Sequence, residues 1–581
     1  MRPPCKRFHP HTPIVQRDAY TTMDAIGIAR HYHETTKHHP NRHARSLGYL
    51  DWATQPDPFR RFRGAPCVPL LLTEPVSIPS YDALYESGSI ASQPVCLESI
   101  SEFLQYSLAL SAWKEFQSSR WALRINPSSG NLHPTEGYLA VGSVRGLADI
   151  SGVFHYAPME HALERRCDIH VDVWYELMNA LPCGTFLAGL SSIHWREAWK
   201  YGERAYRYCQ HDVGHALAAL CFSAALQGWQ VRPLTSMGDA EIGSLLGLNR
   251  DDDFKQAERE YPDVLMAIIP STDSRTTDAP SMLSIDAIET IRQGKWYGKA
   301  NRLSTDHVEW ELIDAVTDAC VKPSTSEFPR LQPTMEFPDR FPSERTPTPA
   351  RRIIQQRRSA VAMDGQTSIT ADQFYLMMDR VLPRYECSPW SALGPPVFVH
   401  LGIFVHSVTG LAAGLYFLVR APSEMLMLRE SMFPAFDWEK PNGCPQSLPL
   451  YHLVSGDARE IAGQVSCGQS IAADGAFSLG MIAEFENPLQ NLGAWMYRRL
   501  FWETGMIGQV LYLEAEAAGI RSTGIGCFFD DSVHDLFGFK GRKYQSLYHF
   551  TVGGPVEDTR LTTLPPYPPE VTARATRPAS T

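Results

Sequence analysis

The feature that most constrains this chain is a long internal repeat. Four landmarks recur with separations of 8, 14 and 19 residues, as Tyr206, Gly214, Gly228 and Gly247 and again as Tyr497, Gly505, Gly519 and Gly538. Upstream, residues 138–166 resemble residues 402–430, and both segments read as an apolar strand, a Gly-Leu turn, a second strand and Ala-Pro. A repeat in register over this length predicts two copies of one folding unit.

The length supports the same division, because 581 residues exceed one ordinary domain and 44% hydrophobic residues can fill full cores. Residues 322–350 hold seven prolines and are typical of an extended linker, with a helix-like stretch around 286–321 before it. We therefore expect an N-terminal extension (1–24), a first domain (25–275), a helix and linker (276–350), a second domain (351–565) and a tail (566–581).

The expected fold class is α+β, with a mostly antiparallel sheet surrounded by helices in each copy. Residues 397–419 contain no charged Asp, Glu, Lys or Arg and could be mistaken for a membrane span. Glycines and polar residues interrupt the run, so it predicts two buried strands instead. The apolar spacing before Gly519 predicts a helix that ends there.

The net charge and the cysteine pattern indicate which classes of partner and which cellular compartment to expect. A net charge of −11 argues against nucleic acid or an anionic membrane as a partner. The 12 cysteines form no C-x-x-C pair, which favours reduced thiols in a cytoplasmic protein over a disulfide framework or a zinc site. The N-terminus has no apolar segment typical of a signal peptide. HETTKHH has Lys37 where the H-E-x-x-H zinc motif needs its second histidine, so no metal is predicted.

Three clusters carry residue types suited to binding a cofactor. Residues 127–131, PSSGN, form a small-residue loop that lets a ligand approach the backbone, although a plain surface turn would look the same. Arg357, Arg358 and Ser359 could clamp a phosphate or form a solvated helix end. Gly524-Ile525-Gly526 could bring backbone N–H groups against a flat ring. Asp530 and Asp531 behind it are expected to cap a helix.

Together these motifs resemble the FMN-dependent nitroreductase superfamily, and most closely its SagB-like branch, the thiazole/oxazole-forming peptide oxidases. The resemblance spans residues 25–565 and includes RINPSSGNLHPTEGY (124–138), WKYGERAYRYCQHDVGH (199–215), QQRRSA (355–360) and TGIGCFFDD (523–531). In that family FMN lies between two domains, usually of two subunits. The resemblance therefore implies that the two fused copies form an internal pseudo-dimer.

The resemblance also implies the cofactor-binding residues, drawn from both copies: Ser128, Ser129 and Asn131 from the first, and Arg357, Arg358, Ser359, Gly524, Ile525, Gly526 and Arg560 from the second. The repeat register places residues 391–395 opposite the PSSGN loop and residues 233–235 opposite the Gly-x-Gly loop. The first copy thus lacks the Gly-x-Gly loop and the second copy lacks the PSSGN loop, so one intact site per chain is expected. A Lys-Tyr pair moves protons in the SagB-like branch, and Lys200 and Tyr201 match it.

The function implied by the resemblance is an FMN-dependent oxidoreductase that transfers hydride between substrate and flavin, such as the oxidation of azolines to azoles in a modified peptide. One alternative is a reductase of nitro compounds or quinones that takes electrons from NAD(P)H. Another is a non-catalytic scaffold on a decayed flavin fold. Neighbouring peptide-modifying enzymes would be partners in the first case.

Overall fold

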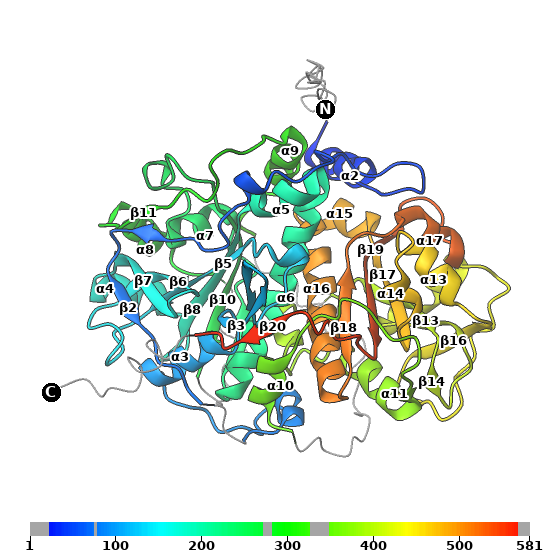
Figure 1. Ribbon diagram of the computed structural model, residues 1–581. Coiled ribbons are helices and arrows are strands. Elements are labelled where there is room, and N and C mark those ends of the chain that lie inside the picture. Colours follow the sequence, from blue (N-terminus) through cyan, green and yellow to red (C-terminus); the bar gives the residue numbers. More distant parts are fainter. Residues whose placement is uncertain (1–22, 75–77, 271–281, 326–347, 395, 568–581) are drawn as a thin grey trace.

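The computed structural model describes residues 23–74, 78–270, 282–325, 348–394 and 396–567. The predicted N-terminal extension up to residue 22, the proline-rich linker over 326–347 and the tail from residue 568 lie outside these ranges. Figure 1 shows the two halves of the chain side by side, with the two longest helices between their sheets.

The first half is built on a seven-stranded sheet in which every neighbouring pair of strands is antiparallel. Its strand order is β2 (Cys67–Pro69), β7 (Ala162–Asp168), β6 (Gly152–Ala157), β5 (Thr135–Val141), β8 (Phe186–Ser192), β10 (Tyr261–Ile269) and β9 (Gln230–Pro233). The helices of this half are α2 (Ala25–Thr35), α3 (Leu97–Gln105), α4 (Val171–Met178), α5 (His194–Tyr201), α6 (Ala205–Leu226), α7 (Asp239–Leu246), α8 (Ile285–Gln293) and α9 (Glu311–Ala319).

The second half is built on a six-stranded antiparallel sheet. Its order is β16 (Leu450–Ser455), β15 (Gly414–Leu418), β13 (Val399–Val405), β17 (Phe477–Glu484), β19 (Tyr544–Gly553) and β18 (Arg521–Ile525). Its helices are α10 (Ala350–Gln356), α11 (Ala371–Arg380), α12 (Met425–Ser431), α13 (Arg459–Val465), α14 (Ser470–Ala473), α15 (Glu486–Leu492), α16 (Met496–Ala517) and α17 (Asp530–Phe537).

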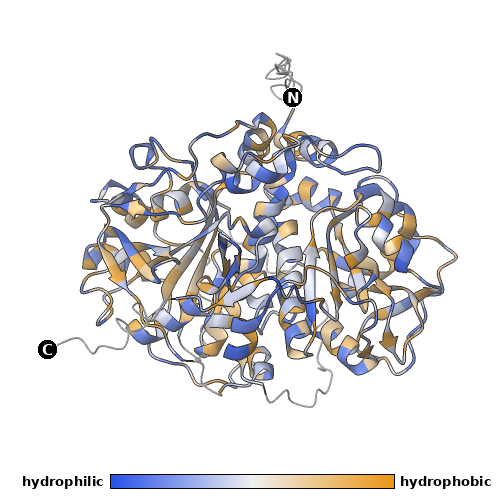
Figure 2. Cartoon of the chain, viewed as in Figure 1, coloured by the Kyte–Doolittle hydropathy of each residue, from blue (hydrophilic) through white to orange (hydrophobic). Residues whose placement is uncertain are grey.

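The two sheets share one strand order once the extra edge strand β2 is set aside. This confirms the expected α+β class with antiparallel sheets surrounded by helices. Strands β13 and β15 also confirm that residues 397–419 form buried strands. Among the described residues, no helix combines the length and apolar character needed to cross a bilayer. Figure 2 shows apolar residues concentrated on the strands and inner helices of both halves.

The repeat landmarks have equivalent places in the two halves. Gly214 of α6 and Gly505 of α16 meet where these 22-residue helices cross, and a Cβ on Gly214 would lie 2.9 Å from Gly505 Cα. The Tyr206 and Tyr497 rings are stacked with centroids 6.4 Å apart. Gly247 and Gly538 end α7 and α17 in the left-handed conformation. The spacing repeated in the two halves therefore corresponds to the helix crossing and the helix ends, where only small or left-handed residues fit.

Several segments cross between the halves and hold them together. Strand β20 (Thr562–Leu564), near the end of the second half, pairs with β3 (Leu110–Phe116) of the first, which also pairs with β4 (Ser119–Arg124). His33 of α2 packs on Phe485, with ring centroids 4.4 Å apart. One hydrophobic core contains buried residues of both halves, such as Leu217 and Leu500.

The segment expected to be one helix-like stretch, residues 286–321, consists of two helices. Helix α8 ends at Gly294, a short strand β11 (Lys299–Ala300) pairs with β1 (Phe62–Arg63), and α9 follows. Buried Ala287, Ile288 and Ile291 of α8 pack in the core of the first half. The chain breaks here because β1 offers a partner for Lys299 and Ala300, a tertiary contact that local propensity does not show.

Candidate active site between the two halves

A cavity of about 610 Å³ lies between the halves and is lined by both. The first half contributes residues 126–131 and side chains of α6, and the second contributes residues 357–361, residues 521–527 and side chains of α16 and β19. Ten of the predicted residues line it: Ser128, Ser129, Asn131, Tyr201, Arg357, Arg358, Ser359, Gly524, Ile525 and Gly526. Residues separated by about 400 positions in the sequence thus meet at one cavity.

The PSSGN loop is a tight turn held by its own hydrogen bonds. Gly130 and Asn131 adopt left-handed φ values of 59° and 60°. Ser129 donates from its backbone N–H and its hydroxyl to the Asp212 carboxylate at 3.1 and 3.2 Å. The Asn131 amide donates to the Ala122 carbonyl at 2.8 Å. The side chains of Ser129 and Asn131 therefore already shape the loop, whose backbone faces the cavity.

Lys200 and Tyr201 reach this loop from the end of α5. A Cβ on Gly130 would lie 2.5 Å from the Tyr201 hydroxyl and 3.1 Å from Lys200 Nζ. Tyr201 lines the cavity, whereas Lys200 is half-buried behind it and is not a lining residue. Burial and then Glu197 raise the pKa of Tyr201 well above its usual value, so its hydroxyl stays protonated.

Arg357 and Arg358 bring positive charge to the cavity without acidic partners. Arg357 is 4% exposed and donates to the Arg124 and Ile125 carbonyls at 3.0 and 2.7 Å. Burial lowers the pKa of Arg357, and burial followed by Arg357 lowers the pKa of Arg358 to about 10. Within the described residues neither arginine forms an ion pair with a carboxylate. A bound anion would supply the missing negative charge.

The Gly-x-Gly loop fits against tyrosines from three elements. A Cβ on Gly524 would lie 1.9 Å from the Tyr548 hydroxyl, and one on Gly526 would lie 2.2 Å from Tyr208 Cε1. Tyr512 Oη accepts hydrogen bonds from the Gly524 N–H at 3.0 Å and from the Ser359 hydroxyl at 2.9 Å. Only glycine allows the loop to approach these rings so closely.

Arg560 is a second predicted residue, besides Lys200, that does not line the cavity. Its side chain is exposed, pairs with Asp558 at 2.8 Å and lies over the Phe116 ring. The other lysine and arginine residues that line the cavity beside Arg357 and Arg358 are Lys114 of β3, Arg124 of β4 and Arg521 of β18. Asp558, two residues earlier in the chain, does line the cavity, so Arg560 lies beside the cavity with its charge paired.

Two buried carboxyl groups, Glu197 and Asp212, lie behind the PSSGN loop. Asp212 is 1% exposed and lines the cavity, and burial raises its pKa to about 7. Burial and then Asp212 raise the pKa of Glu197 well above its usual value, whereas Lys200 and the Ser128 hydroxyl lower it. In the sequence Asp212 and Glu503 each lie two residues before a repeat glycine, Gly214 and Gly505, and no chemical role was predicted for Asp212. The spacing of Tyr208, Asp212 and His215, which puts them on one helix face, could have identified it.

Asp530, expected to cap a helix, is instead the first residue of α17, whose N-cap is Phe529. Its carboxylate accepts from the His38 N–H at 2.9 Å and pairs with Arg204 and Arg207 at 3.1 and 2.8 Å. Burial alone would raise the pKa of Asp530, but the two arginines lower it. Its role is to join the halves behind the Gly-x-Gly loop, because His38 and both arginines belong to the first half.

The pseudo-equivalent position in the other half is filled by the protein itself. Arg499 stands at the repeat position of Tyr208 and donates to the carbonyls of Leu393, Gly394 and Pro396, in the segment opposite the PSSGN loop. Glu503, the counterpart of Asp212, forms a buried ion pair with Arg420. The two positions therefore differ in charge as well as in sequence.

Comparisons with known proteins identify the fold. The nitroreductase family profile matches residues 458–554. A protein named as a nitroreductase from Methanocaldococcus jannaschii is 26% identical over 196 residues, which cover 32% of this chain and 88% of that protein. A chain of the Escherichia coli microcin synthetase McbBCD complex matches 34% of this chain and 71% of its own length at 18% identity. Its TM-score of 0.24 is too low to indicate a shared fold.

A fuller structural match is a protein from Anabaena variabilis whose crystal structure is named as that of a nitroreductase. It has a TM-score of 0.65 and 21% identity, and the match covers 91% of this chain and 99% of that one. Both halves described above therefore have a counterpart in one solved structure. The chain contains a nitroreductase-family domain at residues 458–554 and folds like a nitroreductase over nine-tenths of its length.

Proposed function

We propose that this chain is an FMN-dependent oxidoreductase with one flavin site, in the cavity between its halves. The observation that carries the proposal is the composition of that cavity. Arginines without acidic partners and a glycine loop packed on tyrosines come together in a space of about 610 Å³. This volume lies in the range of about 300–1,000 Å³ typical of cofactor sites.

Phosphate is the chemical group that suits the arginine side of the cavity. Arg357 and Arg358 are held by backbone carbonyls, so their charges are oriented but not neutralised. Arg357 Nε is buried and has no hydrogen-bond partner in the part of the chain that the structure describes. Planar guanidinium groups in this state bind phosphate oxygens bidentately, and a phosphate would offset the cost of burying them.

A flat ring system suits the glycine side. The Gly524–Gly526 loop has no side chains except that of Ile525, and Tyr512 Oη accepts two hydrogen bonds, which leaves its own proton for another acceptor. The left-handed Gly130 faces this loop from the other half. The cavity therefore offers backbone N–H groups and a hydroxyl where a flavin ring has nitrogens and carbonyl oxygens.

When bound, FMN would supply two-electron hydride chemistry. Tyr201 keeps its proton and would donate a hydrogen bond to a substrate heteroatom. Asp212, with a pKa of about 7, can hold or release a proton near neutral pH, and Ser129 fixes its orientation. Lys200, whose Nζ reaches the same loop, would exchange protons with the substrate side of the cavity.

The reaction we propose is substrate oxidation, with azoline-to-azole conversion in a modified peptide as the specific form. Its support is the resemblance of the WKYGER and RINPSSGN segments to the SagB-like branch, together with the placement of Lys200 and Tyr201 at one loop. Steady-state oxidation of NAD(P)H with a nitro or quinone acceptor, without azoline turnover, would instead assign the chain to the reductases.

The first test is flavin quantitation after denaturation of the purified protein. About one FMN per chain is expected, and Arg357→Gln should lower FMN affinity about tenfold or more, since it removes a buried charge-assisted contact. Arg352→Gln is the matched control, because Arg352 is an exposed arginine of α10 five positions earlier. Two FMN per chain would refute the single site, and none after reconstitution would refute the cofactor.

The second test concerns proton transfer. Tyr201→Phe and Lys200→Ala, each with FMN content checked, should lower kcat more than they change FMN binding. Unchanged turnover in Lys200→Ala would remove Lys200 from the mechanism and leave Asp212 as the acid–base group at the loop.

A further inference from the structure

Two cysteines lie together at the edge of the cavity. Cys527 follows directly on the Gly-x-Gly loop and lines the cavity, and Cys467 lies in the loop after α13. Their sulfur atoms are 2.7 Å apart and share a hydrogen bond. Both residues are partly exposed. The sequence shows no pattern here, because 60 residues separate them.

The surroundings favour a thiolate on Cys527 and a thiol on Cys467. Contact with Cys467 lowers the pKa of Cys527, burial opposes this shift, and the Arg204 guanidinium adds to it. The same contact raises the pKa of Cys467. Arg204 is anchored beside the loop by its hydrogen bond to the Gly526 carbonyl at 3.2 Å. A paired thiol with one low-pKa member is the arrangement found in redox-active cysteine pairs.

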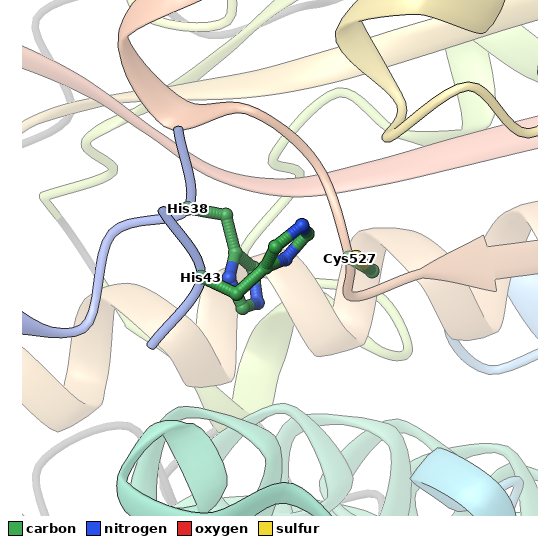
Figure 3. A group of neighbouring side chains, drawn as sticks. All are labelled: His38, His43 and Cys527. Atoms are coloured by element: carbon green, nitrogen blue, oxygen red, sulfur yellow. The ribbon is translucent and has the colours of Figure 1, made fainter. Parts of the chain in front are cut away.

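The imidazole rings of two histidines, His38 and His43, lie next to the cysteine pair. Ring nitrogens of His38 and His43 and the Cys527 sulfur lie within 4.8 Å of one another. Figure 3 shows the three side chains. The Ala44 N–H donates to His38 Nδ1 at 3.1 Å, so a neutral His38 carries its proton on Nε2. That proton occupies the position a metal ion would need, which argues against a metal centre. Burial and then Arg204 lower the pKa of His38 to about 3, so this imidazole stays neutral beside Cys527.

We propose that Cys467 and Cys527 form a reversible disulfide that carries electrons between the cavity and an external disulfide. In the reduction step the disulfide takes up two electrons and one proton, and the sulfur–sulfur bond breaks. Cys527 then becomes a thiolate and Cys467 a thiol. This step rests on the proposed function, because reduced flavin in the cavity is the source of both electrons and of the proton. Re-oxidation is thiol–disulfide exchange, in which an external disulfide takes the two electrons and leaves as a thiol and a thiolate.

The first test needs no flavin. The full chain is treated with oxidised glutathione, its free thiols are alkylated, and its peptides are mapped without reduction. A peptide linked through Cys467 and Cys527 should appear, with two fewer reactive thiols, and both changes should reverse with dithiothreitol. Cys527→Ser and Cys467→Ser should each abolish the link. Cys183→Ser, which changes an exposed cysteine elsewhere, should leave it unchanged.

The second test measures electrons in the flavin-loaded protein under anaerobic conditions. The oxidised wild type should take up about four electrons per chain, and Cys527→Ser about two, because flavin and disulfide are each two-electron couples. A protein that forms no linked peptide, or one that takes up two electrons while the link persists, overturns the relay. Absence of FMN would instead overturn the proposed function, and peptide mapping would still judge the cysteine pair.

Discussion

Gly214 lies at the crossing of α6 and α16, and its replacement by alanine should destabilise the whole protein. A Cβ at this position would lie 2.2 Å from the Trp502 carbonyl oxygen and 2.9 Å from Gly505 Cα. Both neighbours are backbone atoms of a buried helix, so no side chain can rotate to make room. The helices would have to separate by about 1 Å to restore ordinary contact distances.

Two effects of opposite sign decide the magnitude. Alanine is favoured over glycine inside a helix by about 1 kcal/mol. Overpacking a close-packed core costs about 1–3 kcal/mol, and more where backbone must move. At Gly214 backbone must move, so the steric cost lies at the upper end of this range, and after the propensity gain we expect a net loss of about 2 kcal/mol in unfolding free energy. At about 2–4 °C per kcal/mol, the melting temperature should fall by about 4–8 °C.

Gly243 provides the matched control for thermal unfolding. It lies inside α7 and is also buried, but the nearest atom to a Cβ there is Pro262 Cγ at 3.8 Å, an ordinary contact. Gly243→Ala should therefore gain the helix propensity and raise the melting temperature by about 2–4 °C. Gly214→Ala should also weaken FMN retention, because the cavity is built on both crossing helices. A Gly214→Ala protein as stable as Gly243→Ala would refute the tight crossing.

Two further predictions concern buried charge. Burial raises the pKa of Asp212 from 3.8 to about 7, so the folded protein keeps a proton that the unfolded chain releases, and this contribution to stability is lost as pH rises from about 4 through 7. Asp212→Asn removes that dependence. The difference in melting temperature between this variant and wild type should increase with pH and level off above about 7. A difference that stays constant with pH would show that Asp212 is an ordinary carboxyl group. Arg420→Met leaves Glu503 without its ion-pair partner in the core and should lower the free energy of unfolding by about 3–5 kcal/mol, measured by thermal unfolding. The double variant that also carries Glu503→Gln should recover part of this stability. A loss of stability that the second substitution does not change would contradict this prediction.

Much of the architecture could be predicted from the sequence because it depends on local patterns. The uncharged apolar run over residues 397–419, interrupted by glycines, indicated buried strands, and Gly519 indicated the end of α16. The repeat spacing predicted two equivalent halves, and the two sheets share one strand order. The small-residue loop, the arginine pair and the Gly-x-Gly loop were recognisable because each is a short continuous motif.

The tertiary structure alone decided which groups face one another. Arg560 matched by position, yet its side chain pairs with Asp558 and does not line the cavity, while Lys114 lines it without any motif. Asp212 and Glu503 hold equivalent places in the repeat, but only Glu503 has a buried arginine beside it. The contact between Cys467 and Cys527 likewise had no local signal. Charge, proton affinity and thiol chemistry depend on neighbours brought from distant parts of the chain, and packing determines those neighbours.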